Sequence, residues 1–376
     1  MTKLIYVANV RMPTEKAHGY QVAKMCESFV LQKRRITRTG TQTHTESIEV
    51  ELIIPTRHNE IKGDLFDYYN LQKNFKVEKV FVPDFINIAP LFLRKLGFFL
   101  QSLFFLLRLA FLKMEKGAII YSRNPEIVWL FSCWGYKTIF ESHRWVDSKI
   151  WLHKFFIKDA AKVITVTSFL KNLYVGAGFK NADVLVAPDG VDLSIFDIDV
   201  SKEEARKILN LPPDDILLGY TGRTQTMGMG KGVLAVKNIL PLLSSLISTN
   251  RRIQFFVVEG VYRKKLALHQ KAFDVLLMPF PKTTHYSYYM SPMKMFEYMA
   301  SRRPIVSSDL PSIREVLNEQ NAILVEPGNP RALAEGIKKV LDNPEFAQII
   351  ANQAYEDVKQ YTWEKRAERI FKHLKI

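Results

Sequence analysis

The stretch SPMKMFEYMASRRPIVSSDLPSIREVL, residues 291–317, contains most of the information about the fold. Ser291 is a residue type favoured at a helix N-cap and Pro292 one favoured at the first helical position, so we expect a helix to begin here. The apolar residues 304–306 then predict a buried strand, and the polar residues 307–311 predict a turn. A helix followed at once by a short buried strand is typical of a sheet covered by helices.

The same stretch has the features of an anion site followed by a carboxylate. The first turn, Ser291 to Met293, has backbone N–H groups without helical partners, and the helix dipole adds partial positive charge there. Both properties suit a phosphate or a sugar hydroxyl. Glu297 follows Met293 by four positions, so it lies on the same helix face, one turn away. A carboxylate at that place can accept hydrogen bonds from a ribose, and the stretch therefore predicts a sugar-nucleotide site.

Short apolar or β-branched runs recur along the whole chain and predict strands. They alternate with helical segments, which indicates an α/β protein with parallel sheets covered by helices. Ligands of such sheets bind at the carboxyl ends of the strands. The predicted strands are residues 4–8, 49–54, 79–82, 118–121, 138–141, 163–167 and 184–187, and then 216–220, 253–258, 275–278, 305–307 and 322–325.

The two series of strands predict two domains, for which 376 residues are enough. Residues 188–213 look like the connection, because they hold turn residues and a short helix with a capping box. We place the first domain at residues 1–195 and the second at residues 196–358.

The composition indicates an anionic partner but does not distinguish among the possible classes. Lys and Arg number 53 against 38 Asp and Glu, a net charge of +15, which favours nucleotide phosphates, acidic lipid headgroups or nucleic acid. The two cysteines, Cys26 and Cys133, form no disulfide framework and no metal spacing, so we expect a reducing cytoplasm. No secretory signal is recognised, because the apolar run 4–10 is short and fits a first buried strand better.

Two further segments were interpreted from composition alone. Residues 33–47 are rich in threonine and predict a surface loop. Residues 91–116 are the most apolar helix candidate, but Arg94, Lys95 and Arg108 leave no stretch of the ~20 residues that span a bilayer. Such a helix fits either the surface of a membrane or the core of the first domain, and the sequence leaves both open.

Two cations flank a glycine-containing loop directly after the predicted strand 216–220. The loop GRTQTMGMGKG, residues 222–232, includes Arg223 and Lys231, and such a pair can bind a diphosphate. A solvated basic loop would look the same when taken alone. The position at a strand's carboxyl end, together with the anion site at Ser291, favours a ligand site.

In the first half, three residues stand where such sheets present ligands. His143 follows the strand 138–141 and Arg123 follows the strand 118–121, so both are candidates for contacts with a sugar. Gly19 lies at the start of the first helix, where it would allow a substrate to approach the backbone. A satisfied surface histidine and an ordinary turn glycine are the plain alternatives.

Other catalytic patterns are missing from the sequence. There is no P-loop, no GxGxxG after the first strand and no Cys/His cluster. The DxD at residues 197–199 lies in the connection between domains, so we attribute it to chance.

Several segments together resemble the family-4 retaining glycosyltransferases. These segments cover nearly all of the second half, and the first half matches more loosely. They are APDGVDLSIF (187–196), GYTGR with KG (219–223 and 231–232), residues 291–317, NAILVEPGNPRALAEGI (321–337) and YTWEKRAERI (361–370). Members of this family have the GT-B architecture of two Rossmann-like domains facing a cleft. In that architecture residues 359–376 would form a helix that crosses back to the first domain.

The resemblance implies transfer of a sugar from a UDP- or GDP-linked donor, with retention, without a metal and without a further cofactor. Arg223 and Lys231 would neutralise the leaving diphosphate, and Glu297 would hold the ribose hydroxyls. The residues Ser291, Pro292 and Met293 would contact phosphate or donor sugar. His143 would contact the donor sugar, and Gly19 would keep the loop near the phosphates open.

Two departures from the family pattern affect the donor site. Where the family usually has a second glutamate, this chain has Tyr289. Residues 259–274 are too few for the helix, strand and second helix that the family has between two of its strands. Part of the surface that cradles the nucleotide base is therefore expected to be missing.

We therefore expect a glycosyltransferase that acts on a glycan or lipid-linked acceptor in the cytoplasm, with a peripheral place at the anionic inner face of a membrane left open. One rival is a non-catalytic relative that binds a nucleotide or sugar. Another is a basic nucleic-acid-binding protein, which we do not expect because no aromatic-basic module is present.

Overall fold

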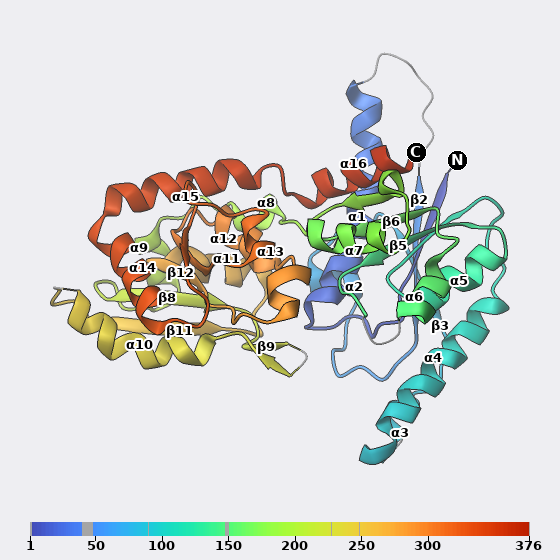
Figure 1. Ribbon diagram of the computed structural model, residues 1–376, viewed down its shortest axis with the longest axis horizontal. Helices are drawn as coiled ribbons and strands as arrows, with labels where there is room; N and C mark the ends of the chain where they lie inside the picture. Colours follow the sequence, from blue (N-terminus) through green and yellow to red (C-terminus); the bar gives the residue numbers. More distant parts are fainter. Residues whose placement is uncertain are drawn as a thin grey trace. The chain divides into compact units, whose positions relative to one another are not determined.

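The computed structural model describes residues 2–39, 48–88, 90–146, 150–226, 228–247 and 249–375. The chain divides into two compact units (Figure 1). The first comprises Met1–Ala187 and Trp363–Ile376, and the second comprises Pro188–Thr362. The predicted α/β class is confirmed, since each unit contains a parallel sheet with helices. The boundaries predicted after residues 195 and 358 both fall inside the second unit.

The sheet of the first unit has the strand order β3-β2-β1-β4-β5-β6-β7. All of its neighbouring pairs are parallel; Ile5 of β1, for example, lies opposite Glu51 on one side and Ile120 on the other. The strands are β1 (Lys3–Val7), β2 (Glu49–Pro55), β3 (Lys76–Val80), β4 (Ile119–Ser122), β5 (Lys137–Ser142), β6 (Lys162–Thr165) and β7 (Val184–Val186).

Helices connect these strands and enclose the apolar residues of the sheet. Residues 33–39 belong to α1, so the predicted surface loop is wrong for that part, and residues 40–47 lie outside the described residues. The helices of the first unit are α1 (Ala17–Thr39), α2 (Leu65–Tyr69), α3 (Phe85–Ile88), α4 (Arg94–Ala110), α5 (Pro125–Cys133), α6 (Ile150–Ile157), α7 (Ser168–Gly176) and α16 (Trp363–Leu374), with 3-10 turns η1 (Leu91–Leu93) and η3 (Asn181–Asp183).

The last helix, α16, belongs to the first unit although it is far away in sequence. Phe371 stacks on Phe29 of α1 with ring centroids 5.0 Å apart, and Trp363 meets Tyr20 edge-on at 6.2 Å. The amide of Gln32 also donates a hydrogen bond to the carbonyl oxygen of Glu364. Aromatic packing of this kind stabilises the attachment of α16 to α1.

The sheet of the second unit has the strand order β11-β8-β12-β13-β14, again parallel throughout. Its strands are β8 (Ile216–Thr221), β11 (Ile253–Val258), β12 (Val275–Met278), β13 (Ile305–Ser308) and β14 (Ile323–Val325). Gly219 of β8 is explained by packing, because a Cβ there would lie 2.0 Å from the ring of Phe273.

Helices and a small hairpin complete the second unit. Ser201 and Glu204 form the capping box that the sequence predicted for α9. The elements are α8 (Leu193–Phe196), α9 (Lys202–Ile208), α10 (Val233–Leu246), α11 (Arg263–Ala272), a π-helix labelled η4 (His285–Tyr289), α12 (Met293–Ala300), α13 (Pro311–Arg314), α14 (Pro330–Asp342), α15 (Pro344–Val358) and the hairpin strands β9 (Gln225–Thr226) and β10 (Met229–Gly230).

Among the described residues, no helix combines the length and the apolar character needed to cross a bilayer. Both cysteines are free thiols, Cys26 buried and Cys133 exposed.

Candidate functional site

The strand order of the second sheet creates a switch point beside β8. The chain passes from β8 to β11 on one side and then returns to β12 on the other. In open sheets of this kind, the connections leave in opposite directions at such a point and open a crevice at the carboxyl ends of the strands. Gly222 and Arg223 follow β8, and Pro279 and Phe280 follow β12, so these residues line the expected crevice.

The loop after β8 brings Lys231 back to the end of β12. The loop folds as the β9–β10 hairpin, with Gly228 at a φ of 76° in its turn. The backbone N–H of Lys231 donates to the carbonyl oxygen of Thr224 at 2.9 Å. Gly232, at a φ of 72°, passes so close to β12 that a Cβ would lie 1.8 Å from the carbonyl oxygen of Pro279. Only glycine fits both the left-handed conformation and this contact.

The predicted cation pair, Arg223 and Lys231, is brought together. Burial, together with the positive charge of Arg223, lowers the pKa of Lys231 to about 8, while Glu259 acts in the opposite direction. Two cations that repel each other in a partly buried place favour an anionic ligand, because the ligand would relieve both the repulsion and the loss of hydration.

A third cation, Lys294, was not predicted from the sequence. Its Nζ lies 3.4 Å from the centroid of the Tyr220 ring and 5.9 Å from that of Phe280, between the ends of β8 and β12. It has no hydrogen-bond partner among the residues that the structure describes. Burial, with the nearby charge of Lys231, holds the pKa of Lys294 well below its ordinary value. A buried amine without a hydrogen-bond partner is rare in proteins unless it has a functional role.

The carboxylate of Glu297 is buried and already paired. The residue is 5% exposed, and its Oε1 accepts a hydrogen bond from Nη1 of Arg263 at 2.7 Å. Arg263 is the first residue of α11 and was also missed by sequence reasoning. The field of Glu297 reaches Lys294 as well. Lys294 thus interacts electrostatically with both Lys231 and Glu297, and Lys231 with Arg223, so the three predicted residues belong to one group. The carboxylate of Glu297 is, however, already bound by Arg263.

The start of α12 differs from the prediction. The helix begins at Met293 with Pro292 at the N-cap position and no side-chain cap, so Ser291 is not the N-cap and Pro292 is not the first helical residue. Instead, the hydroxyl of Ser291 accepts the backbone N–H of Asp189 at 2.9 Å. The prediction was wrong because the π-helix η4 and a residue 102 positions away fix this junction.

In the first unit, His143 and Arg123 meet at one buried carboxylate. Nε2 of His143 lies 2.5 Å from Oε1 of Glu141, and Gln21 donates to the same oxygen at 2.6 Å. Gln21 in turn accepts a hydrogen bond from Arg123 at 2.9 Å. The sequence did not single out Glu141, because it reads as the last residue of an apolar strand.

Glu141 also binds α16, through Nη2 of Arg366 at 3.1 Å. Burial alone would raise the pKa of Glu141, but Arg366, His143 and Arg123 hold it well below the ordinary value. The carboxylate is therefore ionised and fixes one ring nitrogen of His143. This arrangement orients the histidine that the sequence predicted at the end of β5.

Gly19 lies in the first turn of α1, as expected, but its surroundings are protein atoms. A Cβ at this position would lie 2.3 Å from a methyl carbon of Thr14 and 2.4 Å from the hydroxyl of Tyr69. Packing is therefore sufficient to explain the glycine, and a substrate contact there stays a prediction.

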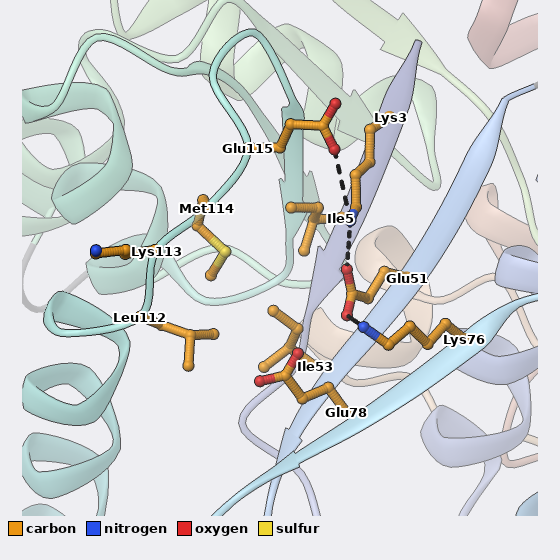
Figure 2. A pocket seen from close by; sticks show the side chains of 10 residues that line it. All are labelled: Lys3, Ile5, Glu51, Ile53, Lys76, Glu78, Leu112, Lys113, Met114 and Glu115. Atoms are coloured by element: carbon orange, nitrogen blue, oxygen red, sulfur yellow. Dashed lines mark ion pairs between the residues drawn. The ribbon is translucent and has the colours of Figure 1, made fainter. Parts of the chain in front are cut away.

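A hollow at the opposite edge of the first sheet is not a candidate site (Figure 2). Its lining includes Lys3, Glu51 and Lys76 at the amino ends of the strands, away from the edge where ligands bind. Figure 2 shows Glu51 between the two lysines, at 2.9 Å and 3.0 Å. The whole lining contains three lysines and three glutamates, so the hollow carries no unbalanced charge for a ligand.

Two other predictions concern the connecting segments. Residues 259–274, all of them described, contain the single helix α11 and no strand, as their length implied. Asp197 of the DxD accepts hydrogen bonds from the hydroxyl of Tyr355 at 2.5 Å and from Arg302 at 3.3 Å, which gives it a structural role.

Part of the second unit is similar to a known protein family. Residues 237–343 match the family described as "Glycosyl transferases group 1". An uncharacterized glycosyltransferase of Methanocaldococcus jannaschii is 27% identical over 245 residues, which cover 58% of this chain and 60% of that protein. A Bacillus subtilis protein named as a teichuronic acid biosynthesis glycosyltransferase, TuaC, is 27% identical over 188 residues, covering 47% of this chain and 46% of TuaC.

The chain thus spans only about half of each of these relatives. Among solved structures, Anabaena HepE in complex with UDP and glucose covers 100% of both chains with a TM-score of 0.64 at 15% identity. At that identity the likeness concerns the fold alone. The second unit therefore resembles glycosyl transferases group 1 over residues 237–343, and the chain has the GT-B fold.

Proposed function

We propose that this protein transfers a sugar from a nucleotide-diphospho-sugar to a glycan or lipid-linked acceptor. The observation that carries the proposal is the group of three basic side chains, Arg223, Lys231 and Lys294, at the switch point of the second sheet. A diphosphate leaving group develops negative charge as the sugar departs, and preorganised cations in a partly dry site stabilise that charge most effectively.

Each site residue has a proposed role. Arg223 and Lys231 bind the outer oxygens of the diphosphate. Lys294 adds a third basic group between the ends of β8 and β12. Glu297 accepts a ribose hydroxyl on Oε2, because Arg263 occupies Oε1. The backbone at Ser291, Pro292 and Met293 contacts phosphate or donor sugar.

The resemblance also gives roles to residues of the first unit. His143, oriented by Glu141, contacts the donor sugar, with Arg123 beside it in the same network. Gly19 lies at the start of α1, where the helix dipole favours an anion.

The finer chemistry is part of the proposal. The resemblance to the family-4 enzymes supports retention at the anomeric carbon and a reaction without a metal. It also supports a UDP- or GDP-linked hexose as donor, and the HepE complex with UDP and glucose makes UDP the first nucleotide to test. A lipid-linked acceptor would place the reaction in the cytoplasm, at the inner face of a membrane.

The test is a panel of UDP- and GDP-sugars assayed for binding and for transfer or hydrolysis, with and without a chelator. Lys231→Ala and Glu297→Ala should weaken nucleotide binding, whereas Lys237→Ala on the exposed side of α10 should not. The proposal fails if no nucleotide sugar binds, or if both site variants behave as wild type. Binding without turnover would identify the protein as a non-catalytic relative.

A further inference from the structure

One face of α4 is covered with apolar side chains that no other part of the described chain covers. We call this the α4 face. Phe92 is 82% exposed and Phe99 is 62% exposed, values unusual for phenylalanine in a folded protein. The α4 face consists of the exposed side chains of Phe92, in the turn η1 directly before the helix, and of Leu96, Phe99, Leu100, Leu103 and Leu107.

The positions on the α4 face follow a helical repeat. Residues 92, 96, 99, 103 and 107 recur every three or four positions and so form one stripe. At 1.5 Å per residue, the stripe from Phe92 to Leu107 is about 22 Å long. Such a continuous stripe is a surface rather than a set of scattered apolar residues.

The opposite side of the same helix fixes its orientation. Gly97, Gln101, Phe105 and Leu109 are buried, and Phe105 and Leu109 pack into the core beside Ile5, Val7 and Val80. A helix held this way cannot turn its outer stripe inward. The helix α4 therefore has one core side and one outward apolar side.

The segment that carries the α4 face is rich in basic side chains. Within residues 90–117, all described, the one acidic residue is Glu115, whose Oε2 lies 3.7 Å from Nζ of Lys3. The exposed cations of the same segment are Arg94, Lys95, Arg108, Lys113 and Lys116. α3 and the first turns of α4 extend beyond the rest of the first unit (Figure 1). An apolar stripe in a segment with an excess of exposed cations complements an anionic lipid surface, where aliphatic and aromatic groups enter the acyl boundary and cations meet the headgroups.

We propose that the α4 face docks the protein on the surface of an anionic lipid bilayer, with α4 lying in the plane of the interface. The helix lies on the membrane rather than spanning it, since about 22 Å of helix is shorter than the ~30 Å hydrocarbon core. This inference names the lipid surface at which the proposed transfer would occur, but binding to lipid does not depend on that activity.

The experiment is flotation of the full chain with vesicles of phosphatidylcholine alone and of phosphatidylcholine mixed with phosphatidylglycerol. The wild type should bind the mixed vesicles more tightly, and added salt should weaken that preference. Phe99→Glu combined with Leu103→Glu should weaken binding about tenfold or more. Arg94→Gln with Lys95→Gln should remove much of the preference for the anionic vesicles and leave the weaker binding to neutral ones.

The matched control is Leu234→Glu combined with Ile349→Glu, two side chains of the second unit that are 73% and 64% exposed. This control should bind vesicles as the wild type does. Thermal unfolding and UDP affinity, measured on every variant, separate loss of docking from misfolding and from failure of the proposed function. Equal vesicle binding by all variants would overturn the inference. The inference would also be overturned if the wild type does not bind vesicles. This holds both if the α4 variants abolish a concentration-dependent dimer and if they have no effect.

Discussion

Nη1 of Arg263 lies 2.7 Å from Oε1 of Glu297, and this ion pair joins the first residue of α11 to the acid of α12. The side chains are 20% and 6% exposed, so the pair is largely shielded from water. Arg263 reaches Glu297 from a connection of residues 259–274 that holds a single helix. The short segment therefore contributes a cation that holds the carboxylate of Glu297, the acid proposed to bind the ribose.

We predict that Arg263→Met lowers the free energy of unfolding by about 3 kcal/mol, because it leaves a buried carboxylate without its partner. Glu297→Gln should cost less, since it removes the charge together with the need for a cation. Urea denaturation of both single variants and the double variant checks this. The two effects should be clearly non-additive, and additive effects would contradict a direct interaction.

Nucleotide affinity should depend on the protonation of Lys231. Its pKa in the free protein is about 8, and a bound diphosphate would raise it. UDP therefore binds best below pH 8, and its affinity should fall as pH rises from the free towards the bound pKa. Calorimetric titrations between pH 7 and pH 9 measure this change. Lys231→Arg, which stays charged, should give a nearly flat profile, and an unchanged slope in this variant would exclude Lys231 as the titrating group.

Lys294 should have opposite effects on stability and on binding. Its folded-state pKa lies below the unfolded value, so the unfolded chain binds more protons, and this lysine destabilises the fold at every pH below its unfolded pKa. Lys294→Met should therefore raise the free energy of unfolding at pH 7, while weakening UDP binding by about tenfold, or about 1.4 kcal/mol. If Lys294 had a structural role only, its substitution would not raise the free energy of unfolding while weakening UDP binding.

Binding of UDP should also transfer a proton to the Lys231–Lys294 pair, because the ligand's charge favours both ammonium forms. Calorimetry in buffers of different ionisation enthalpy measures that uptake. Wild type should take up a fraction of a proton at pH 8, and Lys294→Met should take up less. Equal uptake by both proteins would assign the proton to Lys231 alone.

A stability prediction concerns Arg206, which is 1% exposed. It donates to the carbonyl oxygens of Ala272 and Pro213 and to Oδ2 of Asp274, the last at 2.6 Å. Arg206→Met should lower the free energy of unfolding by about 3–5 kcal/mol, because Asp274 loses a buried partner. Exposed Arg331→Met should change it by well under 1 kcal/mol. Chemical denaturation of the two variants provides the comparison.

The sequence predicted the strands well because buried parallel strands are short apolar runs with recognisable turns around them. Ile253–Val258 and Val275–Met278, for example, were predicted with the bounds that the structure shows. Arg223 and Lys231 could be predicted because each follows from its place relative to a strand. The start of α12 could not, since Ser291 bonds to Asp189, more than a hundred residues earlier.

The residues that the sequence missed have roles created by tertiary contacts. Lys294 looks like a solvated helix residue until Tyr220 and Phe280 enclose it. Its one local signal is its place between Met293 and Met295, inside an otherwise apolar run. Arg263 pairs with a residue 34 positions away and Glu141 with one 2 positions away. No local pattern specifies the directions of these side chains.

The attachment of α16 to the first unit has a consequence for synthesis of the protein. Arg366 of this helix donates to the carbonyl oxygen of Ala187 and reaches Glu141, so the final residues complete a core begun by the earliest ones. During synthesis, the first unit therefore cannot complete its core until the second unit has left the ribosome. Nascent chains stalled short of Trp363 should accordingly be protease-sensitive in their first 187 residues, even when the trailing unit has already become resistant.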